Sequence, residues 1–387
     1  MTARCRQQAA GACPRPGVAE VLTRFHEACL CRYGGTMDAT QRKALQCILL
    51  CRTEAMGGRR YRCGHCQKDH FAWHSCNHRL CPVCGGAGTA AWVAAKLEER
   101  LRVDHYMITF TLPAQLREAC LRDPAASYKH FFACAAKAIK DVLKQPRHLS
   151  GQCGFYGMLQ TWRQDMGLHP HIHFIIPAVA LGSHGRLNYP RRRGWLARGD
   201  VFAARLRTLL STALVRENIL PRQQLEGLRT IKWNCDVAHF GDGANAIKYI
   251  GAYLHKGPIC DSRILEADER SVTISVKDRT IGKTAALVIE GADFVRRYLQ
   301  HALPHGFHRL RYFGFLHPRA RATLAAIRAR LGGPVRKHLP PAEPAEPPVL
   351  LCPHCRRPMA LIGHRSRAPP HQRVIHRLWN RNPRVAA

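Results

Sequence analysis

A short apolar run that contains two histidines places the strongest constraint on this chain. His171-Ile172-His173 opens a run of β-forming residues that ends at a proline, as a buried strand would. Side chains alternate between the two faces of a strand, so His171 and His173 share one face. Ile172 and Phe174 share the other face, which needs an apolar core to cover it. The run therefore predicts a sheet with one buried face and one face that carries paired imidazoles.

A pair of tyrosines is the second informative motif. Tyr249 and Tyr253 lie four apart within residues 244–255, which read as a helix that ends before Gly257. Residues four apart share one face of a helix. Either pair alone is usually a packing feature, and a phenol with a pKa near 10 is a weak nucleophile. Together, a metal held by His171 and His173 could polarise a phosphate for attack by a tyrosine.

The histidine segment offers more ligands than a core strand needs. His169 adds a third imidazole within five residues, and every buried ring nitrogen requires a partner. A metal ion satisfies two rings at once. Gln160, Gln164 and His169 are candidates for a third ligand by position, and the sequence does not choose among them.

The charge of the chain indicates a polyanionic partner. Its 387 residues carry 60 Lys+Arg against 26 Asp+Glu, a net charge of +34. Such a charge favours nucleic acid, although ribosomal-type and membrane-surface proteins are also basic. The hydrophobic content of 46% suits a folded protein with a sizeable core.

No apolar stretch is long enough for a membrane span and no signal core follows Met1, so we expect a cytoplasmic, nucleoid-associated protein with no membrane partner.

The chain has 18 cysteines, which in a reducing compartment indicate metal binding more than disulfides. Two Cys-x2-Cys pairs, called knuckles here, lie about 15 residues apart. This is the spacing of a structural zinc site made by four thiolates. The predicted ligands are Cys63, Cys66, Cys81 and Cys84.

Other cysteines leave the zinc ligand set open. Cys76 and His78 lie between the two knuckles and could replace one of the four ligands. Cys352 and Cys355 form an isolated half-knuckle that lacks two further ligands, so metal binding and an inert pair are equally good interpretations.

The predicted elements mix strands and helices without regular βαβ alternation. This order favours an α+β fold with a largely antiparallel sheet. The expected helices cover residues 18–55 in two pieces, 89–102, 128–143, 202–217, 244–255 and 293–303, and the expected strands cover residues 105–112, 155–162, 171–177, 230–233, 272–276 and 286–289.

One loop combines cations with aromatic side chains. Arg191, Arg192 and Arg193 lie between Tyr189 and Trp195. Arginines contact phosphates and aromatic rings stack on bases, so the segment is a candidate platform for single-stranded DNA. A solvated surface loop is an equally good interpretation.

Several motifs in order resemble the two-tyrosine rolling-circle transposases of the insertion-sequence 91 type, within the HUH endonuclease superfamily. The resemblance runs from about Val18 to Cys355. Its motifs are Tyr61-Arg62-Cys63, Ser75-Cys76-Asn77 through Cys84, Phe110-Thr111-Leu112-Pro113, Gln160-Thr161-Trp162, His169 to His173, Tyr249-x3-Tyr253, Leu303 to Arg309 and Arg311-Tyr312-Phe313-Gly314.

The resemblance implies a mechanism. His171 and His173 would bind Mg²⁺ or Mn²⁺, and Tyr249 and Tyr253 would be nucleophiles that form a 5′-phosphotyrosine on single-stranded transposon ends before transfer to target DNA. A host helicase or replication machinery would assist, because no Walker-type motif is present. The implied domains are an N-terminal helical and zinc-binding domain (1–100), an HUH catalytic domain with a central antiparallel sheet flanked by helices (101–333), a proline-rich linker (334–350) and a basic tail with the half-knuckle (351–387).

Other functions fit part of the sequence. A non-catalytic zinc-containing DNA-binding regulator explains the charge and the cysteines but not the histidine and tyrosine pairs. A metal-free tyrosine recombinase would use arginines and a histidine around one tyrosine, as His308, Arg311 and Tyr312 faintly suggest. A transposase with a carboxylate triad is disfavoured because acidic residues are scarce.

Overall fold

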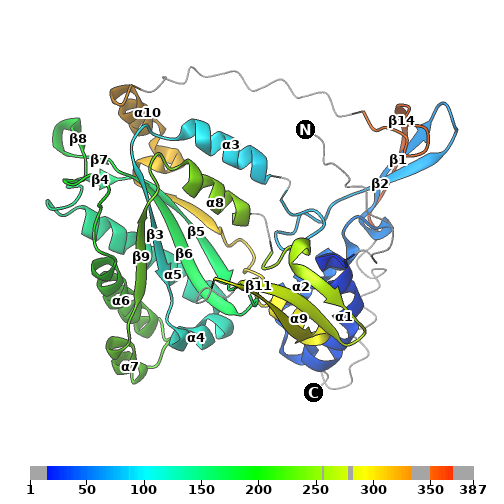
Figure 1. Cartoon of the computed structure of the whole chain (residues 1–387), viewed down its shortest axis with the longest axis horizontal. Helices are drawn as coiled ribbons and strands as arrows, with labels where there is room; N and C mark the ends of the chain where they lie inside the picture. The colour runs from blue at the N-terminus through cyan, green and yellow to red at the C-terminus, as the bar shows by residue number, and fades with distance from the viewer. Residues whose placement is uncertain (1–14, 87, 255–256, 278–281, 333–348, 369–387) are drawn as a thin grey trace.

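The computed structural model describes residues 15–86, 88–254, 257–277, 282–332 and 349–368. Its centre is a five-stranded antiparallel sheet in the order β13-β5-β6-β3-β9 (Figure 1). The strands are β3 (His105–Thr111), β5 (Phe155–Trp162), β6 (Leu168–Pro177), β9 (Asn234–His239) and β13 (Leu310–Phe313). The predicted α+β class with a central antiparallel sheet is confirmed.

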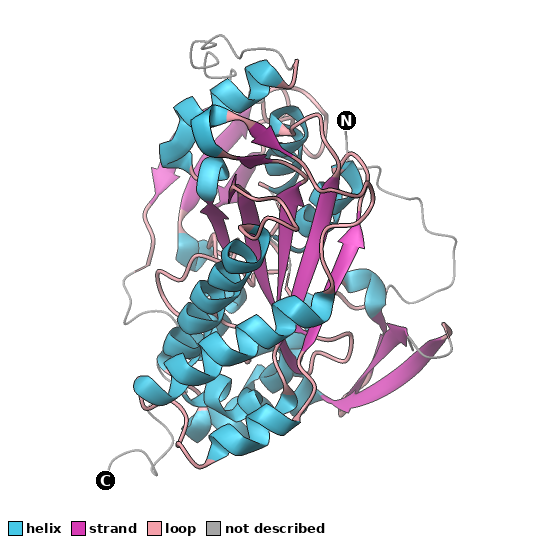
Figure 2. Cartoon of the chain, turned by 90° about the vertical axis from the view of Figure 1, so that its left-hand side faces the viewer, coloured by secondary structure: helices cyan, strands magenta, loops and turns pink. Residues whose placement is uncertain are grey.

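Helices cover both faces of this sheet. The long helices α5 (Pro124–Leu143) and α6 (Gly199–Arg216) pack on one face, in front of the strands in Figure 2. Ile172 and Phe174 point into this apolar layer, as strand alternation predicts. The opposite face, which carries His171 and His173, packs against α8 (Ala244–Leu254), and α3 (Thr89–Glu99) lies against α8.

Short elements complete this domain. They are α4 (Arg117–Arg122), α7 (Gln224–Thr230), α10 (Arg321–Arg330), and the small sheet of β4 (Gln152–Cys153), β7 (Ala180–Leu181) and β8 (Leu187–Asn188).

A second core lies beside the five-stranded sheet. It packs α1 (Val18–Tyr33), α2 (Ala39–Leu50) and α9 (Gly291–Leu299) against β10 (Ile264–Ala267), β11 (Ser271–Lys277) and β12 (Thr284–Glu290). Asp38 begins α2 with a capping box, because its carboxylate accepts from the Gln41 N–H at 2.7 Å. Segments far apart in the sequence therefore share one core.

A three-stranded ribbon projects from the molecule at the upper right of Figure 1. Its order is β14-β1-β2, with β1 (Gly58–Cys63) in the centre, β2 (Asp69–Trp73) on one side and β14 (Met359–Arg365) on the other. Residues 359–365 are thus part of a sheet with the N-terminal region, instead of lying in a separate tail. The linker residues 333–348 and the basic residues 369–387 are outside the described ranges.

The sequence misplaced one strand. The expected strand at 230–233 is wrong, because α7 ends at Thr230 and β9 begins at Asn234. Trp233 instead turns back, and its indole N–H donates to the Leu228 carbonyl at 2.9 Å. β9 is a polar edge strand, so it lacks the apolar pattern that identified β6. Among the described helices, none is both long and apolar enough to cross a membrane.

Candidate active site and cysteine clusters

The two histidines of β6 are buried and held in fixed orientations. His171 is 9% exposed and His173 is 5% exposed. The Nδ1 atom of His171 lies 2.7 Å from the His169 carbonyl oxygen. Because a carbonyl can only accept, Nδ1 carries a proton, so Nε2 is the ring nitrogen of His171 that could bind a metal ion. The Nδ1 atom of His173 contacts the Thr109 hydroxyl at 2.9 Å, on the neighbouring strand β3.

The tyrosine helix α8 is positioned by a glycine turn and by its apolar face. The Asp242 carboxylate accepts from the Ala244 N–H at 3.0 Å. Gly243 has a φ of +81°, and a Cβ there would lie 2.4 Å from the His105 ring, so only glycine fits. Ile247 and Ile250 are buried against the sheet.

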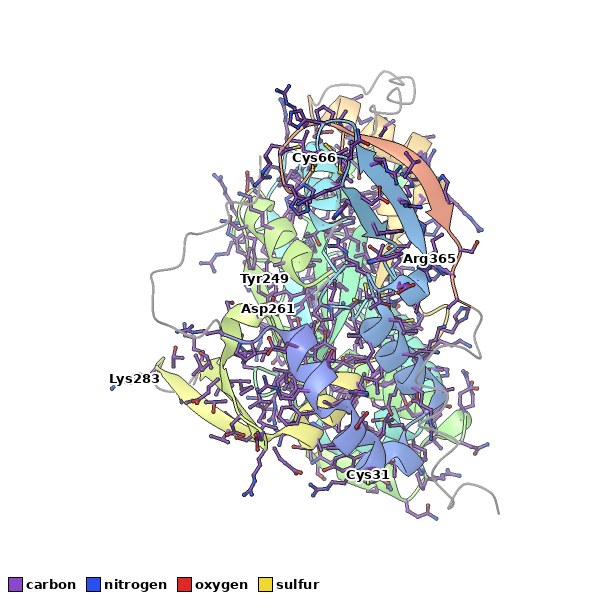
Figure 3. The ribbon with its side chains drawn as sticks, turned by 90° about the vertical axis from the view of Figure 1, so that its right-hand side faces the viewer. Cys31, Cys66, Tyr249, Asp261, Lys283 and Arg365 are labelled. Atoms are coloured by element: carbon purple, nitrogen blue, oxygen red, sulfur yellow. The ribbon has the colours of Figure 1, made fainter. Side chains whose placement is uncertain are left out.

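The histidine and tyrosine pairs meet between β6 and α8. The rings of His173 and Tyr249 are 5.3 Å apart, and those of Tyr249 and Tyr253 are 5.1 Å apart. The ring centres of His171 and His173 lie 4.8 Å apart, so the four aromatic rings form a continuous row. Figure 3 shows Tyr249 on α8. The structure thus brings together the four side chains that the sequence singled out.

The candidates for a third ligand occupy different places. Gln160 on β5 pairs directly with His171 on β6, so both side chains lie on the same face of the sheet. Gln160 is 7% exposed, and its buried Oε1 has no hydrogen-bond partner among the described residues. Gln164 is used elsewhere, because its Oε1 accepts from the Lys277 N–H at 2.5 Å. His169 lies next in the ring row, 5.3 Å from His171.

A buried arginine connects the five-stranded sheet with the end of the tyrosine helix. Arg309 is 6% exposed and donates to the carbonyls of Leu159 at 2.9 Å and Leu254 at 3.3 Å. Its guanidinium also lies 4.6 Å from the centre of the Trp162 ring. Burial, together with the nearby Arg79, lowers the pKa of Arg309 to about 9, so the group remains charged at neutral pH.

Replacing Arg309 with methionine is expected to destabilise the domain that contains the five-stranded sheet. The change leaves two buried carbonyls without a donor, which costs roughly 2–4 kcal/mol of unfolding free energy. Denaturant unfolding measures this loss. The Arg311→Met variant is the control, because Arg311 packs its guanidinium against Phe132 and Phe307 without bonding α8. An Arg309 variant as stable as the wild type would contradict this account of α8.

The arginine triplet lies away from this site. Arg191, Arg192 and Arg193 are exposed in a loop, and Arg193 contacts Asp104 at 3.7 Å. Asp104 precedes β3 by one residue and lies five residues from Thr109, about 16 Å along an extended strand. The triplet therefore lies near the opposite end of the strands from the histidine pair.

The structure corrects the predicted zinc ligands, because it places the two knuckles in different clusters. Cys81 and Cys84 lie with Cys51 and Cys76, whereas Cys63 and Cys66 lie with the distant Cys352 and Cys355. Within each cluster the sulfur atoms all lie within 4.8 Å of one another. His78 joins neither cluster; its Nδ1 accepts from the Leu80 N–H at 3.3 Å.

The sulfur spacings fit a tetrahedral metal site. Cys76 and Cys84 have sulfurs 3.6 Å apart, and the Cys63–Cys355 separation is 3.4 Å. Four thiolates bound to zinc at 2.3 Å lie about 3.8 Å apart, whereas a disulfide is about 2.05 Å long. The donor set and the spacing therefore suit structural zinc in each cluster.

Sequence reasoning missed three contributors to these sites. Cys51 lies alone in the sequence and carries no knuckle signature. The pairing of two half-knuckles was missed because 286 residues separate Cys66 from Cys352. Cys352 and Cys355 lacked two further metal ligands in the sequence, and this was the signal that could have suggested the pairing. Thr109, which orients His173, has no sequence signal of its own.

Comparisons with known families match two parts of the chain. Residues 21–112 match a family described as "Transposase zinc-binding domain". Residues 154–323, which contain the histidine and tyrosine pairs, match a family described as "Putative transposase".

Two curated proteins are similar along most of their length. The chain is 29% identical to "Putative transposase y4qJ" of Sinorhizobium fredii, over 82% of this chain and 84% of that protein. It is 24% identical to the transposase for insertion sequence element IS801 of Pseudomonas savastanoi pv. phaseolicola, over 70% of this chain and 68% of that protein. No solved structure matches. With a match to a transposase zinc-binding domain ahead of a match to a transposase family, this chain belongs to the transposases of the insertion-sequence 91 family.

Proposed function

We propose that this transposase nicks single-stranded transposon ends through a 5′-phosphotyrosine and transfers the strand by a rolling-circle mechanism. The observation that carries the proposal is the row of aromatic rings. The ring centre of Tyr249 lies 5.3 Å from that of His173 and 5.1 Å from that of Tyr253. The proposed metal is Mg²⁺ or Mn²⁺, and the proposed substrates are the transposon ends and the target DNA.

Three side chains on β5 and β6 could hold a divalent cation. We propose Nε2 of His171, Nε2 of His173 and Oε1 of Gln160 as the ligands. The first and third are supported by the tautomer that the His169 carbonyl imposes and by the buried amide oxygen of Gln160. When bound, the cation would polarise the scissile phosphate and stabilise the leaving oxygen.

The chain supplies the nucleophile and its position. The Oη atom of one tyrosine attacks phosphorus, the P–O3′ bond breaks, and the phenol proton is lost as the 3′ oxygen gains one. One phosphodiester replaces another, so no nucleotide cofactor is consumed. The ring contact places Tyr249 nearer to His173, and Tyr253 one helical turn further along can accept a second strand end.

Two alternatives receive less support. A metal-free recombinase would need Arg311 beside a tyrosine nucleophile, yet Arg311 packs on Phe132 and Phe307 in the core on the opposite face of the sheet from α8. A non-catalytic DNA-binding regulator gives no reason to hold Tyr249 against His173.

Gln160 provides a specific test of the proposed metal site. Gln160→Leu removes the amide oxygen while keeping the volume, so the Mn²⁺ concentration for half-maximal nicking is expected to rise by roughly 10–100-fold. Gln160→Glu keeps an oxygen ligand and should require no more Mn²⁺ than the wild type. Nicking titrations with Mn²⁺ measure the difference. Equal Mn²⁺ requirements for the leucine and wild-type proteins would exclude Gln160 as a ligand.

Nicking assays on DNA ends test the proposed function. Single-stranded and duplex oligonucleotides from both ends of the element are incubated with Mn²⁺ or with EDTA. Cleavage of the single-stranded ends with Mn²⁺ alone is expected. Cleavage that persists in EDTA would instead favour the metal-free recombinase.

A further inference from the structure

The strongest unassigned feature is the cysteine cluster that joins two segments far apart in the sequence. Its four residues are Cys63 and Cys66 near the N-terminus and Cys352 and Cys355 near the C-terminus. The match to the transposase zinc-binding domain ends at residue 112, so that family accounts for only half of this cluster. Figure 3 shows Cys66 at the tip of the ribbon, opposite the end that carries Arg365.

The two half-knuckles have the same backbone geometry. In each, the first cysteine's carbonyl accepts from the N–H four residues later, and its N–H donates to the carbonyl five residues later. The bonds are Gln67 N to Cys63 O at 3.0 Å, Cys63 N to Lys68 O at 3.0 Å, Arg356 N to Cys352 O at 2.9 Å and Cys352 N to Arg357 O at 2.8 Å.

The same strained position occurs in both turns. Gln67 has a φ of +56° and Arg356 has a φ of +59°. Residues other than glycine rarely adopt such values. Their recurrence at equivalent places indicates one shared requirement, which is to aim two thiolates from each turn at a common point.

Apolar burial around the cluster is too small to hold the C-terminal segment. Within the described residues 349–368, only Cys352 and Met359 are buried in the local core. Leu351 is 49% exposed and Leu361 is 47% exposed. A sheet this small usually needs a metal or a disulfide to be stable, and 3.4 Å between the Cys63 and Cys355 sulfurs excludes a disulfide there.

We propose that the chain binds a second zinc ion through Cys63, Cys66, Cys352 and Cys355, and that this ion clamps the C-terminal segment onto the N-terminal ribbon. The four thiolates suit zinc as a structural ion. The clamp makes β14 a strand of the zinc-binding ribbon. The N-terminal ribbon and the described C-terminal segment are thereby joined, and this joint does not use the residues proposed to cleave DNA.

Metal content tests the number of sites. The full-length protein is expected to contain two zinc ions per chain by elemental analysis. The double variant Cys352→Ser/Cys355→Ser should contain one. The matched control Cys31→Ser/Cys260→Ser, at two exposed cysteines outside the clusters, should keep two. One zinc per chain in the wild type, or iron in place of zinc, would overturn the proposal.

A cleavage experiment tests the clamp without measuring activity. A protease recognition sequence is inserted within residues 333–348, and cleavage is confirmed on a denaturing gel. The C-terminal fragment of the zinc-loaded protein should co-elute with the remainder in gel filtration. The fragment should separate when the protein carries Cys352→Ser/Cys355→Ser. Separation from the zinc-loaded protein, or retention in the serine variant, would contradict the clamp.

Discussion

Replacing both Tyr249 and Tyr253 with phenylalanine is expected to abolish nicking, with a loss of at least about 10³-fold, because no phenol then remains to attack phosphorus. The fold should persist, since phenylalanine keeps the ring packing between α8 and His173. Gel assays of covalent protein–DNA adducts on single-stranded ends measure the loss.

Single variants separate the two tyrosines. Tyr249→Phe is expected to slow nicking more than Tyr253→Phe, because Tyr249 is the one in ring contact with His173. The matched control is Tyr33→Phe, at a half-buried tyrosine that packs against the second core, outside the proposed site, and should leave the rate unchanged. An adduct that persists in the double variant would show that neither tyrosine is the nucleophile.

Losing the first cysteine cluster (Cys51, Cys76, Cys81 and Cys84) is expected to have the largest effect on stability. Cys81 is 2% exposed and packs in the core shared by α1, α2 and α9. Cys81→Ser removes one of four thiolates, and structural zinc sites contribute several kcal/mol to folding. We expect the melting temperature to fall by on the order of 10 °C, together with the loss of one zinc ion.

Thermal unfolding and zinc analysis measure this effect together. Cys31→Ser is the control, since Cys31 is exposed and outside the clusters. If Cys81→Ser kept the wild-type melting temperature and zinc content, the first cluster would have no structural role.

Local patterns in the sequence were sufficient for the main elements of the site. Strand alternation predicted that His171 and His173 share a face, and i, i+4 spacing predicted that Tyr249 and Tyr253 do. The structure confirms β6 and α8 close to the expected bounds. These predictions succeeded because each depends on a few neighbouring residues.

Long-range pairing could not be predicted in the same way. The position of Gln160 opposite His171 depends on the register between β5 and β6. The zinc ligands were grouped wrongly because sequence proximity favoured joining Cys66 with Cys81, whereas the folded chain brings Cys66 to Cys352. Strand register, and contacts between residues far apart in the sequence, are set by the packing of the whole molecule.

The central claim is that a tyrosine of α8 becomes covalently attached to DNA. Wild-type protein is incubated with single-stranded terminal fragments and Mn²⁺, digested with nuclease and protease, and analysed by mass spectrometry. We predict a nucleotide linked through phosphate to the peptide that contains Tyr249 or Tyr253. An adduct on any other residue, or cleavage with no adduct at all, would contradict the account.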